Sequence, residues 1–226
     1  QTMLFSATMP DDIVRLATGY MKLPFRVEIA RPGTTPERVE QELFVVKKDD
    51  KNRLLEKLLL EYPGSVLVFS RTKYGAHKIA RAIRDMGHSS EDLHSGRSLP
   101  QRRKALENFK SGRCRVLVAT DIASRGIDVV GIELVGNYDI PEKPEDYIHR
   151  IGRTGRAGEA GRAISFATPE QGRAVREIEG LLRALIAVSK LPELPPRREV
   201  PPHRMRPPVK THQRSHGHQG RRWHRR

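Results

Sequence analysis

The stretch best suited to chemistry is residues 149–156, which read His-Arg-Ile-Gly-Arg-Thr-Gly-Arg. Arg150, Arg153 and Arg156 lie within seven residues, and each of the last two follows a glycine. Arginine is always charged and presents a planar fork of donors that fits phosphate oxygens. Glycine lets the backbone approach a ligand closely. A solvated basic loop is the alternative interpretation, but this density and spacing favour a phosphate-binding site.

Three other segments carry motif-like residues in a fixed order. Ser6-Ala7-Thr8 lies near the start, residues 66–72 read Val-Leu-Val-Phe-Ser-Arg-Thr, and residues 119–128 read Ala-Thr-Asp-Ile-Ala-Ser-Arg-Gly-Ile-Asp. These segments resemble motifs III, IV and V of the DEAD-box RNA helicases, and residues 149–156 closely resemble motif VI. His149 favours the DEAD-box branch, because the related DEAH and RecQ-type helicases usually carry Gln there. The resemblance extends to about residue 187.

The resemblance implies roles for residues of the last two motifs. Arg153 and Arg156 match two arginines that contact the γ-phosphate of ATP across an interdomain cleft, where positive charge stabilises phosphoryl transfer. His149 matches a residue that links the ATP and RNA sites. Asp128 matches an aspartate that accepts a hydrogen bond from the nucleotide ribose, beside tight backbone that Gly126 permits. A helix cap is the alternative for Asp128, and an ordinary hydrogen-bonded histidine is the alternative for His149.

Two further motif residues have less direct roles. A purely structural role for Arg150, in which it holds the loop or pairs with a carboxylate, is one of two open alternatives beside a functional one. Asp121 is unable to bind phosphate directly and is expected to orient a neighbouring side chain.

The resemblance also implies contacts with the RNA backbone. The candidate residues follow predicted strands or open a predicted helix, and they are Arg71, Thr72, Gly96, Arg97, Arg102, Thr120 and Arg125. Thr120 is expected to bond an RNA phosphate through its hydroxyl and its backbone N–H, and Arg125 to pair with a carboxylate or with RNA. Leu99 departs from the family, which usually has Gln there, so either the RNA backbone has one polar partner fewer or Leu99 packs into the core.

Two motifs of such an enzyme do not occur in this sequence: the phosphate-binding P-loop and the Asp-Glu-Ala-Asp motif. We therefore expect the back half of an ATP-dependent RNA helicase, whose Mg²⁺ ligands lie in a separate N-terminal RecA-like domain. The expected parts are a remnant of that domain (1–24), a linker (25–38), the C-terminal RecA-like domain (39–188) and a disordered basic tail (189–226). A non-catalytic RNA-binding module is the alternative.

The alternation of elements predicts the fold class. The expected strands are 39–48, 65–70, 89–94, 115–120, 133–139 and 161–167, and the expected helices are 49–61, 73–86, 100–111, 144–151 and 169–188. Continuously apolar strands between helices indicate a parallel sheet covered on both faces, hence a three-layer α/β domain. Ligands bind such sheets at the carboxyl ends of the strands. The RecA-like label comes from the resemblance.

Composition points to a polyanionic partner. The net charge is +15, and residues 188–226 hold 11 Lys and Arg against 2 Asp and Glu. Cys114 is the single cysteine, which we interpret as a small packed residue. No apolar run is long enough to span a membrane and no signal peptide is recognisable, so we expect a cytoplasmic protein that binds RNA, as single strands and short duplexes, and no membrane.

The tail predicts a sequence-independent RNA tether. It combines seven prolines with many arginines and few large apolar side chains, so it cannot offset its ordering entropy. Its basic side chains are suited to phosphates, and Trp223 to stacking on an unpaired base. Solvated histidine is favoured over a metal site for His212, His216 and His218. A solubilising tail that binds nothing is the alternative.

Removal of residues 190–226 should weaken RNA binding similarly for unrelated sequences. The slope of log affinity against log salt should flatten by about 0.7 for each RNA phosphate that the tail no longer neutralises. Binding titrations at several salt concentrations measure both quantities. Identical affinity and slope in the truncated chain would establish the solubilising tail instead.

Overall fold

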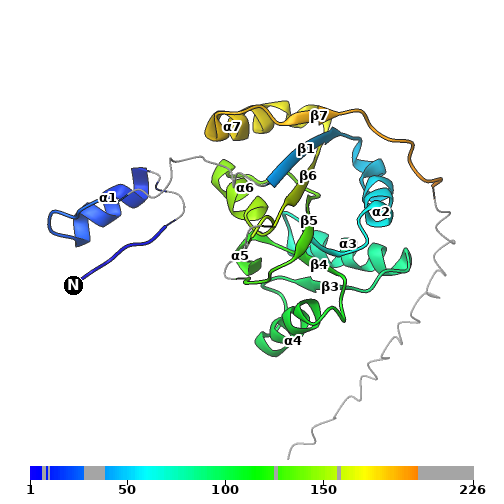
Figure 1. The fold of residues 1–226 in the computed structure, drawn as a ribbon, viewed down its shortest axis with the longest axis horizontal. Helices are drawn as coiled ribbons and strands as arrows, with labels where there is room; N and C mark the ends of the chain where they lie inside the picture. The colour runs from blue at the N-terminus through cyan, green and yellow to red at the C-terminus, as the bar shows by residue number, and fades with distance from the viewer. Residues whose placement is uncertain (7–8, 10, 28–38, 125–126, 157–158, 198–226) are drawn as a thin grey trace, which may run out of the picture. The chain divides into compact units, whose positions relative to one another are not determined.

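The computed structural model describes residues 1–6, 9, 11–27, 39–124, 127–156 and 159–197. Within these, seven parallel strands form one sheet (Figure 1). Their order is β3 (Ser90–Leu93), β4 (Val116–Ala119), β2 (Ser65–Phe69), β5 (Ile132–Asn137), β6 (Gly161–Ala167), β1 (Val39–Val45) and β7 (Ala187–Ser189). The predicted parallel sheet is confirmed.

Helices cover both faces of this sheet. One apolar cluster joins it to α2 (Lys51–Glu61) and α3 (Lys73–Asp85). The other joins it to α4 (Leu99–Lys110), α6 (Pro144–Ile151) and α7 (Gly172–Leu182). Strand β2 shows why: Val66 and Val68 belong to the first cluster, whereas Leu67 and Phe69 belong to the second. Alternate side chains of a strand point to opposite faces, so an apolar run feeds two cores. This is the predicted three-layer α/β fold.

The parallel sheet gathers several loops at one edge. The residues that follow β2, β3, β4 and β5 all leave from the carboxyl ends of neighbouring strands. The short helix α5 (Asp121–Ser124), which follows β4 directly, is not among the elements expected from sequence. The described candidate residues after β2, β3 and β4 therefore come from one side of the domain, as the fold class requires.

The helix expected over residues 169–188 is wrong over its last six residues, 183–188. A 3-10 turn (Pro169–Gln171) leads into α7, which ends at Leu182, and β7 then adds a parallel strand beside β1. Arg183 caps the helix in the left-handed region, at φ 53°. Leu185, placed on the predicted apolar stripe, is 87% exposed. The amphipathic spacing of the sequence continues past the end of the helix. The left-handed conformation of Arg183 and the pairing of the following strand with β1 end the helix instead.

The chain from β7 to Pro196 packs on the domain. Leu194 contacts the cluster beneath α2 and α3. Arg53 donates from Nε to the carbonyl oxygen of Pro195 at 2.6 Å and from Nη2 to that of Leu194 at 3.3 Å. This places the first residues of the predicted tail against the folded domain. Residues 198–226 lie outside the described residues. The predictions of disorder for this segment, and of roles for its histidines and for Trp223, concern those residues.

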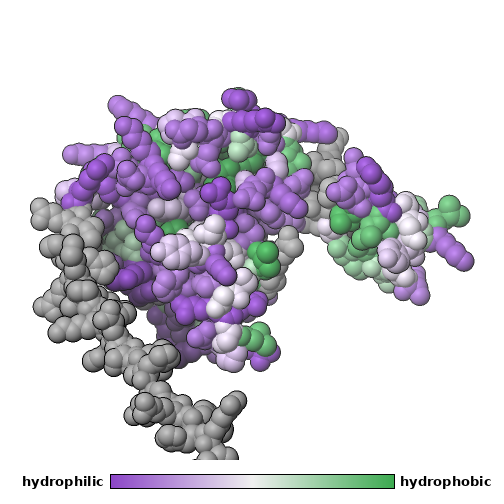
Figure 2. All heavy atoms as spheres, turned by 180° about the vertical axis from the view of Figure 1, so that it is seen from behind, coloured by the Kyte–Doolittle hydropathy of each residue, from purple (hydrophilic) through white to green (hydrophobic). Residues whose placement is uncertain are grey.

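The N-terminal segment buries little. Its helix α1 (Asp11–Tyr20) contains no buried residue. Met3, Phe5, Tyr20, Leu23 and Phe25 are all exposed, and Figure 2 shows hydrophobic surface gathered on this segment. A segment that leaves so many apolar side chains exposed packs poorly by itself. No described helix is long and apolar enough to cross a membrane.

Cys114 is 2% exposed, and burial raises the pKa of its thiol to about 11. The thiolate, which is the reactive form, is therefore disfavoured. The prediction of a small packed residue is confirmed.

Gly161 offers a test of how residues 149–156 are held. A Cβ atom at Gly161 would lie 2.5 Å from Oγ1 of Thr154, which itself bonds the carbonyl of Ile132. We expect Gly161→Ala to lower the free energy of unfolding by about 1–3 kcal/mol, through overpacking. Gly180→Ala is the control, because nothing lies within 4 Å of its added Cβ, and it should stabilise by about 0.4–1 kcal/mol. Urea unfolding measures both, and equal midpoints would contradict this tight packing.

Candidate functional site

Arg150 lies buried at the carboxyl edge of the sheet, with a side chain that is 1% exposed. Its Nε and Nη2 donate to the two carboxylate oxygens of Asp121 at 2.5 and 2.8 Å. Its Nη1 donates to the carbonyl of Asp139 at 2.6 Å and to Oδ1 of Asn137 at 3.3 Å. The guanidinium also lies 5.1 Å from the ring centre of Phe69. A buried charge with this many partners is a structural link between loops, so Arg150 takes the carboxylate-pairing alternative and Asp121 orients it.

Arg153 lies three residues further on, in the turn that follows α6. Its Nη1 donates to the carbonyl of Ile127 at 2.7 Å and its Nε to that of His149 at 3.2 Å. Burial, followed by the nearby charge of Arg156, lowers the pKa of the Arg153 guanidinium, and Asp128 acts in the opposite direction. Arg153 is therefore held against residues of the segment that contains Asp128.

Arg156 reaches the same segment. Its Nη1 lies 3.3 Å from Oδ1 of Asp128, and its Nε donates to the carbonyl of Gly152 at 2.8 Å. The Asp128 side chain is 86% exposed and that of Arg156 is 31% exposed. Three predicted residues, Asp128, Arg153 and Arg156, thus come together with their charged ends partly open to solvent. Gly126 and Arg125 lie outside the described residues.

The loop after β3 is built around a buried carboxylate. Asp92 accepts hydrogen bonds from Nη2 of Arg97 at 2.6 Å and from Nε of Arg97 at 3.1 Å. Nε2 of His94 lies 2.7 Å from Asp92, while Nδ1 of His94 accepts from the N–H of Gly96 at 3.1 Å. Nδ1 of His77 lies 3.4 Å from Asp92. Burial would raise the pKa of Asp92, but the bonds from Arg97 and His94 outweigh it and lower that pKa.

This network changes the expected role of Arg97. The Asp92 carboxylate holds the Arg97 fork in a two-bond ion pair, so that fork is not presented to a ligand as a free charge. Arg97 instead fixes the loop that carries Gly96. Sequence reasoning missed Asp92, because its partners become neighbours only when the strand and loop fold.

The loop after β2 is held in a similar way. Oδ2 of Asp139 accepts from the backbone N–H of Arg71 at 3.0 Å and from Oγ of Ser70 at 3.2 Å. Thr72 caps α3, accepting from the N–H of Gly75 at 2.9 Å. Buried Lys51 lies 3.5 Å from Asp139 and donates to the carbonyl of Tyr138. The backbone here is fixed while the Arg71 side chain is 55% exposed. Asp139 was missed, although its place after β5 at the carboxyl edge was a usable signal.

Thr120 differs in part from its prediction. Its backbone N–H donates to the carbonyl of Leu93 at 3.2 Å, and its own carbonyl accepts from Ala123 and Ser124. In this structure the chain between β4 and α5 uses that N–H itself, and the expected contact with an RNA phosphate stays a prediction. Only the hydroxyl is left for such a contact.

The start of α4 presents one predicted residue and one departure from the family pattern. Ser98 and Gln101 form a capping box, so the Gln101 carboxamide bonds its own helix and does not replace the missing glutamine. Leu99 is 56% exposed, which contradicts the alternative that it packs into the core. Nε of Arg102 is buried without a partner among the described residues.

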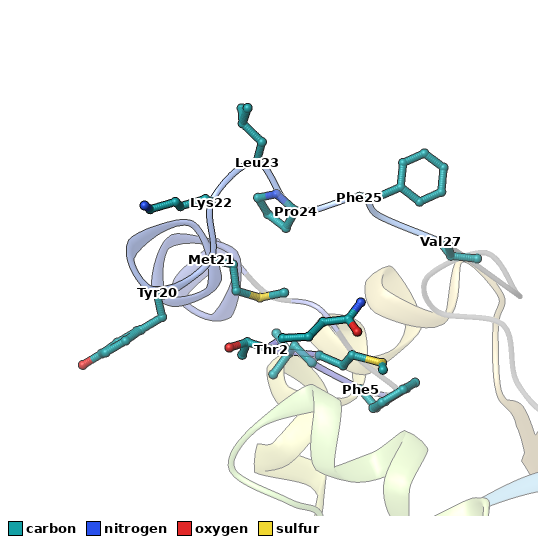
Figure 3. Close-up of a pocket in the computed structure, with 12 residues that line it drawn as sticks. Thr2, Phe5, Tyr20, Met21, Lys22, Leu23, Pro24, Phe25 and Val27 are labelled. Carbon is teal, nitrogen blue, oxygen red and sulfur yellow. The ribbon is translucent and has the colours of Figure 1, made fainter.

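A hollow in the N-terminal segment is not this site. It is lined by residues from both ends of the segment, including Thr2, Phe5, Met21, Pro24 and Phe25 (Figure 3). Its lining includes one charged side chain, Lys22, and is otherwise mostly apolar. Among the residues that the structure describes, no group of three or more His, Cys, Asp or Glu side chains could hold a metal ion.

Comparison with known proteins bears on the same residues. Residues 50–158 match the family model described as "Helicase conserved C-terminal domain". The ATP-dependent RNA helicase DbpA of Bacillus subtilis (strain 168) is 40% identical over 179 residues, which make up 79% of this chain and 37% of that protein. The RNA helicase CrhR of Synechocystis sp. is 40% identical over 194 residues, 85% of this chain and 39% of that protein. The chain thus spans well under half the length of these relatives.

Solved structures of other proteins also resemble this domain. The crystal structure of the E. coli DEAD-box protein SrmB, bound to regulator of ribonuclease activity A, aligns with a TM-score of 0.64 and 31% identity, over 68% of this chain and 92% of that one. S. cerevisiae Dbp5 bound to RNA and ADP BeF3 aligns with a TM-score of 0.76 and 30% identity, over 82% and 50%. The chain belongs to the DEAD-box RNA helicases, and its domain has their RecA-like fold.

The ion pair of Arg150 is testable by stability. Arg150→Ala should lower the free energy of unfolding by about 3–5 kcal/mol, because it leaves the Asp121 carboxylate and the Asp139 carbonyl without their partner. Urea unfolding with far-UV circular dichroism measures the change.

Arg173→Ala is the matched control. Arg173 also pairs with a carboxylate, Glu177 at 3.0 Å, but its side chain is 87% exposed, and surface pairs contribute little. The buried link would be refuted by similar unfolding midpoints for the two variants.

Proposed function

We propose that this chain is the ATP- and RNA-contacting C-terminal half of an ATP-dependent RNA helicase that separates short duplexes locally. The observation that carries the proposal is the grouping of Asp128, Arg153 and Arg156, with the two guanidiniums beside each other and Asp128 exposed. Family membership supports it, as does the Dbp5 structure solved with RNA and ADP BeF3.

In this proposal Arg153 and Arg156 contact the γ-phosphate of ATP, and Asp128 accepts from the ribose. Their present bonds to the carbonyls of Ile127 and Gly152 hold the side chains beside Asp128. A phosphate offers stronger, charged acceptors for the same forks. The carbonyl of His149 accepts from Arg153, and in this proposal His149 links the ATP site to the RNA side.

The rest of the ATP site is supplied by a partner domain. No P-loop occurs in this sequence, and the described residues provide no set of metal ligands. We therefore propose that the P-loop and the ligands of Mg²⁺ belong to an N-terminal RecA-like domain of the same protein. ATP and RNA together would bring the two domains into contact.

RNA would bind at the carboxyl ends of β2, β3 and β4. Arg71, Arg102 and the hydroxyls of Thr72 and Thr120 would contact phosphates, and Gly96, which has no side chain, would let the RNA backbone approach the loop closely. Such backbone contacts carry little sequence information, and contact with the 2′-hydroxyl would favour RNA over DNA. The buried partners of Arg97 and Arg150 keep these loops in place.

Arginine substitution tests the ATP role. In a protein that joins this chain to the P-loop half of a DEAD-box helicase, Arg153→Ala or Arg156→Ala should slow RNA-stimulated ATP hydrolysis by about 10³-fold or more. The charge acts mainly in the transition state, so RNA affinity without nucleotide should change little. Phosphate release and RNA titration measure the two quantities.

The unjoined chain provides the baseline. It should show no RNA-stimulated ATP turnover, because it has no P-loop. Turnover by the unjoined chain, or near-normal turnover in both arginine variants, would reject the assignment. RNA binding that persists with no ATP effect of either arginine would favour the non-catalytic RNA-binding module.

A further inference from the structure

Helix α3 has one buried and one exposed face. Its buried residues, Ala76, Ile79, Ala80 and Ile83, pack against the sheet. On the opposite side Tyr74, Lys78 and Arg81 are exposed, and their spacing of four and three residues places them in one row. We call this row the α3 face.

The charge of α3 is nearly all of one sign. Its basic residues are Lys73, Lys78, Arg81 and Arg84, and its first acidic residue is Asp85, the last residue of the helix. In two other helices, by contrast, a basic residue has an acidic partner on the same helix: Lys57 of α2 lies 3.4 Å from Glu61, and Arg173 of α7 lies 3.0 Å from Glu177. A positive face of this kind attracts a polyanion rather than stabilising its own helix.

The α3 face continues directly from the proposed RNA site. The helix begins after Arg71 and is capped by Thr72. The side chain of Lys73 lies beside the loop after β3, where Cδ would be 3.6 Å from a Cβ placed on Gly96. One turn further on, His77 contacts Asp92 of the same network. The first turns of α3 therefore line the loop proposed to contact RNA.

Tyr74 indicates which form of RNA suits this face. Tyr74 is 78% exposed, and an aromatic ring among basic side chains is the arrangement that binds unpaired bases by stacking while cations contact the phosphates. The row from Tyr74 to Arg81 is about 10 Å long at 1.5 Å per residue. At about 3.4 Å per nucleotide of a stacked strand it spans roughly three nucleotides.

We infer that the α3 face binds single-stranded RNA that extends beyond the RNA site proposed at the carboxyl ends of β2, β3 and β4, which we call the strand-end site. Tyr74 stacks on one base, and Lys78 and Arg81 contact the adjoining phosphates. The inference rests on the proposed function, because it requires that the same strand be bound at the carboxyl edge of the sheet.

The experiment compares two labelled oligouridine RNAs, of about 6 and about 12 nucleotides, by fluorescence anisotropy with the 226-residue chain. Lys78→Glu/Arg81→Glu should weaken binding of the longer RNA by about tenfold or more and leave the shorter RNA nearly unchanged. Tyr74→Ala should weaken binding of the longer RNA by about fivefold or more, and Tyr74→Phe should keep wild-type affinity, since the ring still stacks. The tail is present in every variant.

Arg173→Glu/Arg176→Glu is the control, because it makes the same change in net charge on α7, which packs on the other face of the sheet. Equal loss in the control and the α3 variant, or equal loss for both RNA lengths, would overturn the inference. Unchanged binding of both RNAs by the α3 variant would also overturn it. Melting temperatures confirm that each variant is folded.

Arg71→Ala distinguishes a failure of the α3 inference from a failure of the proposed function. It should weaken the shorter RNA, which tests the strand-end site alone. If Arg71→Ala weakens the shorter RNA while the α3 variants change nothing, the proposed function stands and the α3 inference fails. If the wild-type chain binds neither RNA, both fail.

Discussion

The buried ion pair between Arg150 and Asp121 is the constraint on which the site depends. A guanidinium that is 1% exposed is stable only where its donors are matched, and here a carboxylate, a carbonyl and an amide provide acceptors. These acceptors come from the start of α5 and the end of β5. The pair thereby fixes α6 relative to two loops, and Arg153 and Arg156 follow at defined positions.

Carboxylates divide the basic residues of this edge into two groups. Arg97 and Arg150 are held by Asp92 and Asp121 and serve to position loops. Arg71 projects from a backbone that Asp139 anchors, and its side chain is over half exposed. Arginines that look equivalent in the sequence therefore have different roles, which depend on whether a buried carboxylate pairs with the side chain. The exposed group, extended by the α3 face, is the part suited to a polyanion.

The proposed ATP site would form one side of an interface that a second domain completes. Asp128 is largely exposed, and its link to Arg156 at 3.3 Å is a surface pair, which a ligand can exchange for its own contacts at little cost. The charge of Arg156 lies close enough to Arg153 to lower the pKa of the Arg153 guanidinium. An anion bound between the two guanidiniums would offset their repulsion. Nucleotide binding would therefore stabilise these charged side chains, which is consistent with a site completed by a second domain.

The sequence by itself determined the fold class, the two-sided burial of strands such as β2, and the packing of Cys114, because these follow from local apolar patterns. It also identified the residues that come together around Asp128, through the resemblance of their motifs to those of the DEAD-box helicases. Only the tertiary structure showed that α7 stops at Leu182, that the Thr120 N–H is used by Leu93, and that Arg97 is bound to Asp92. Each of these depends on a left-handed residue or on a strand or side-chain partner brought close by the fold, and periodicity along the chain carries no information about such pairings.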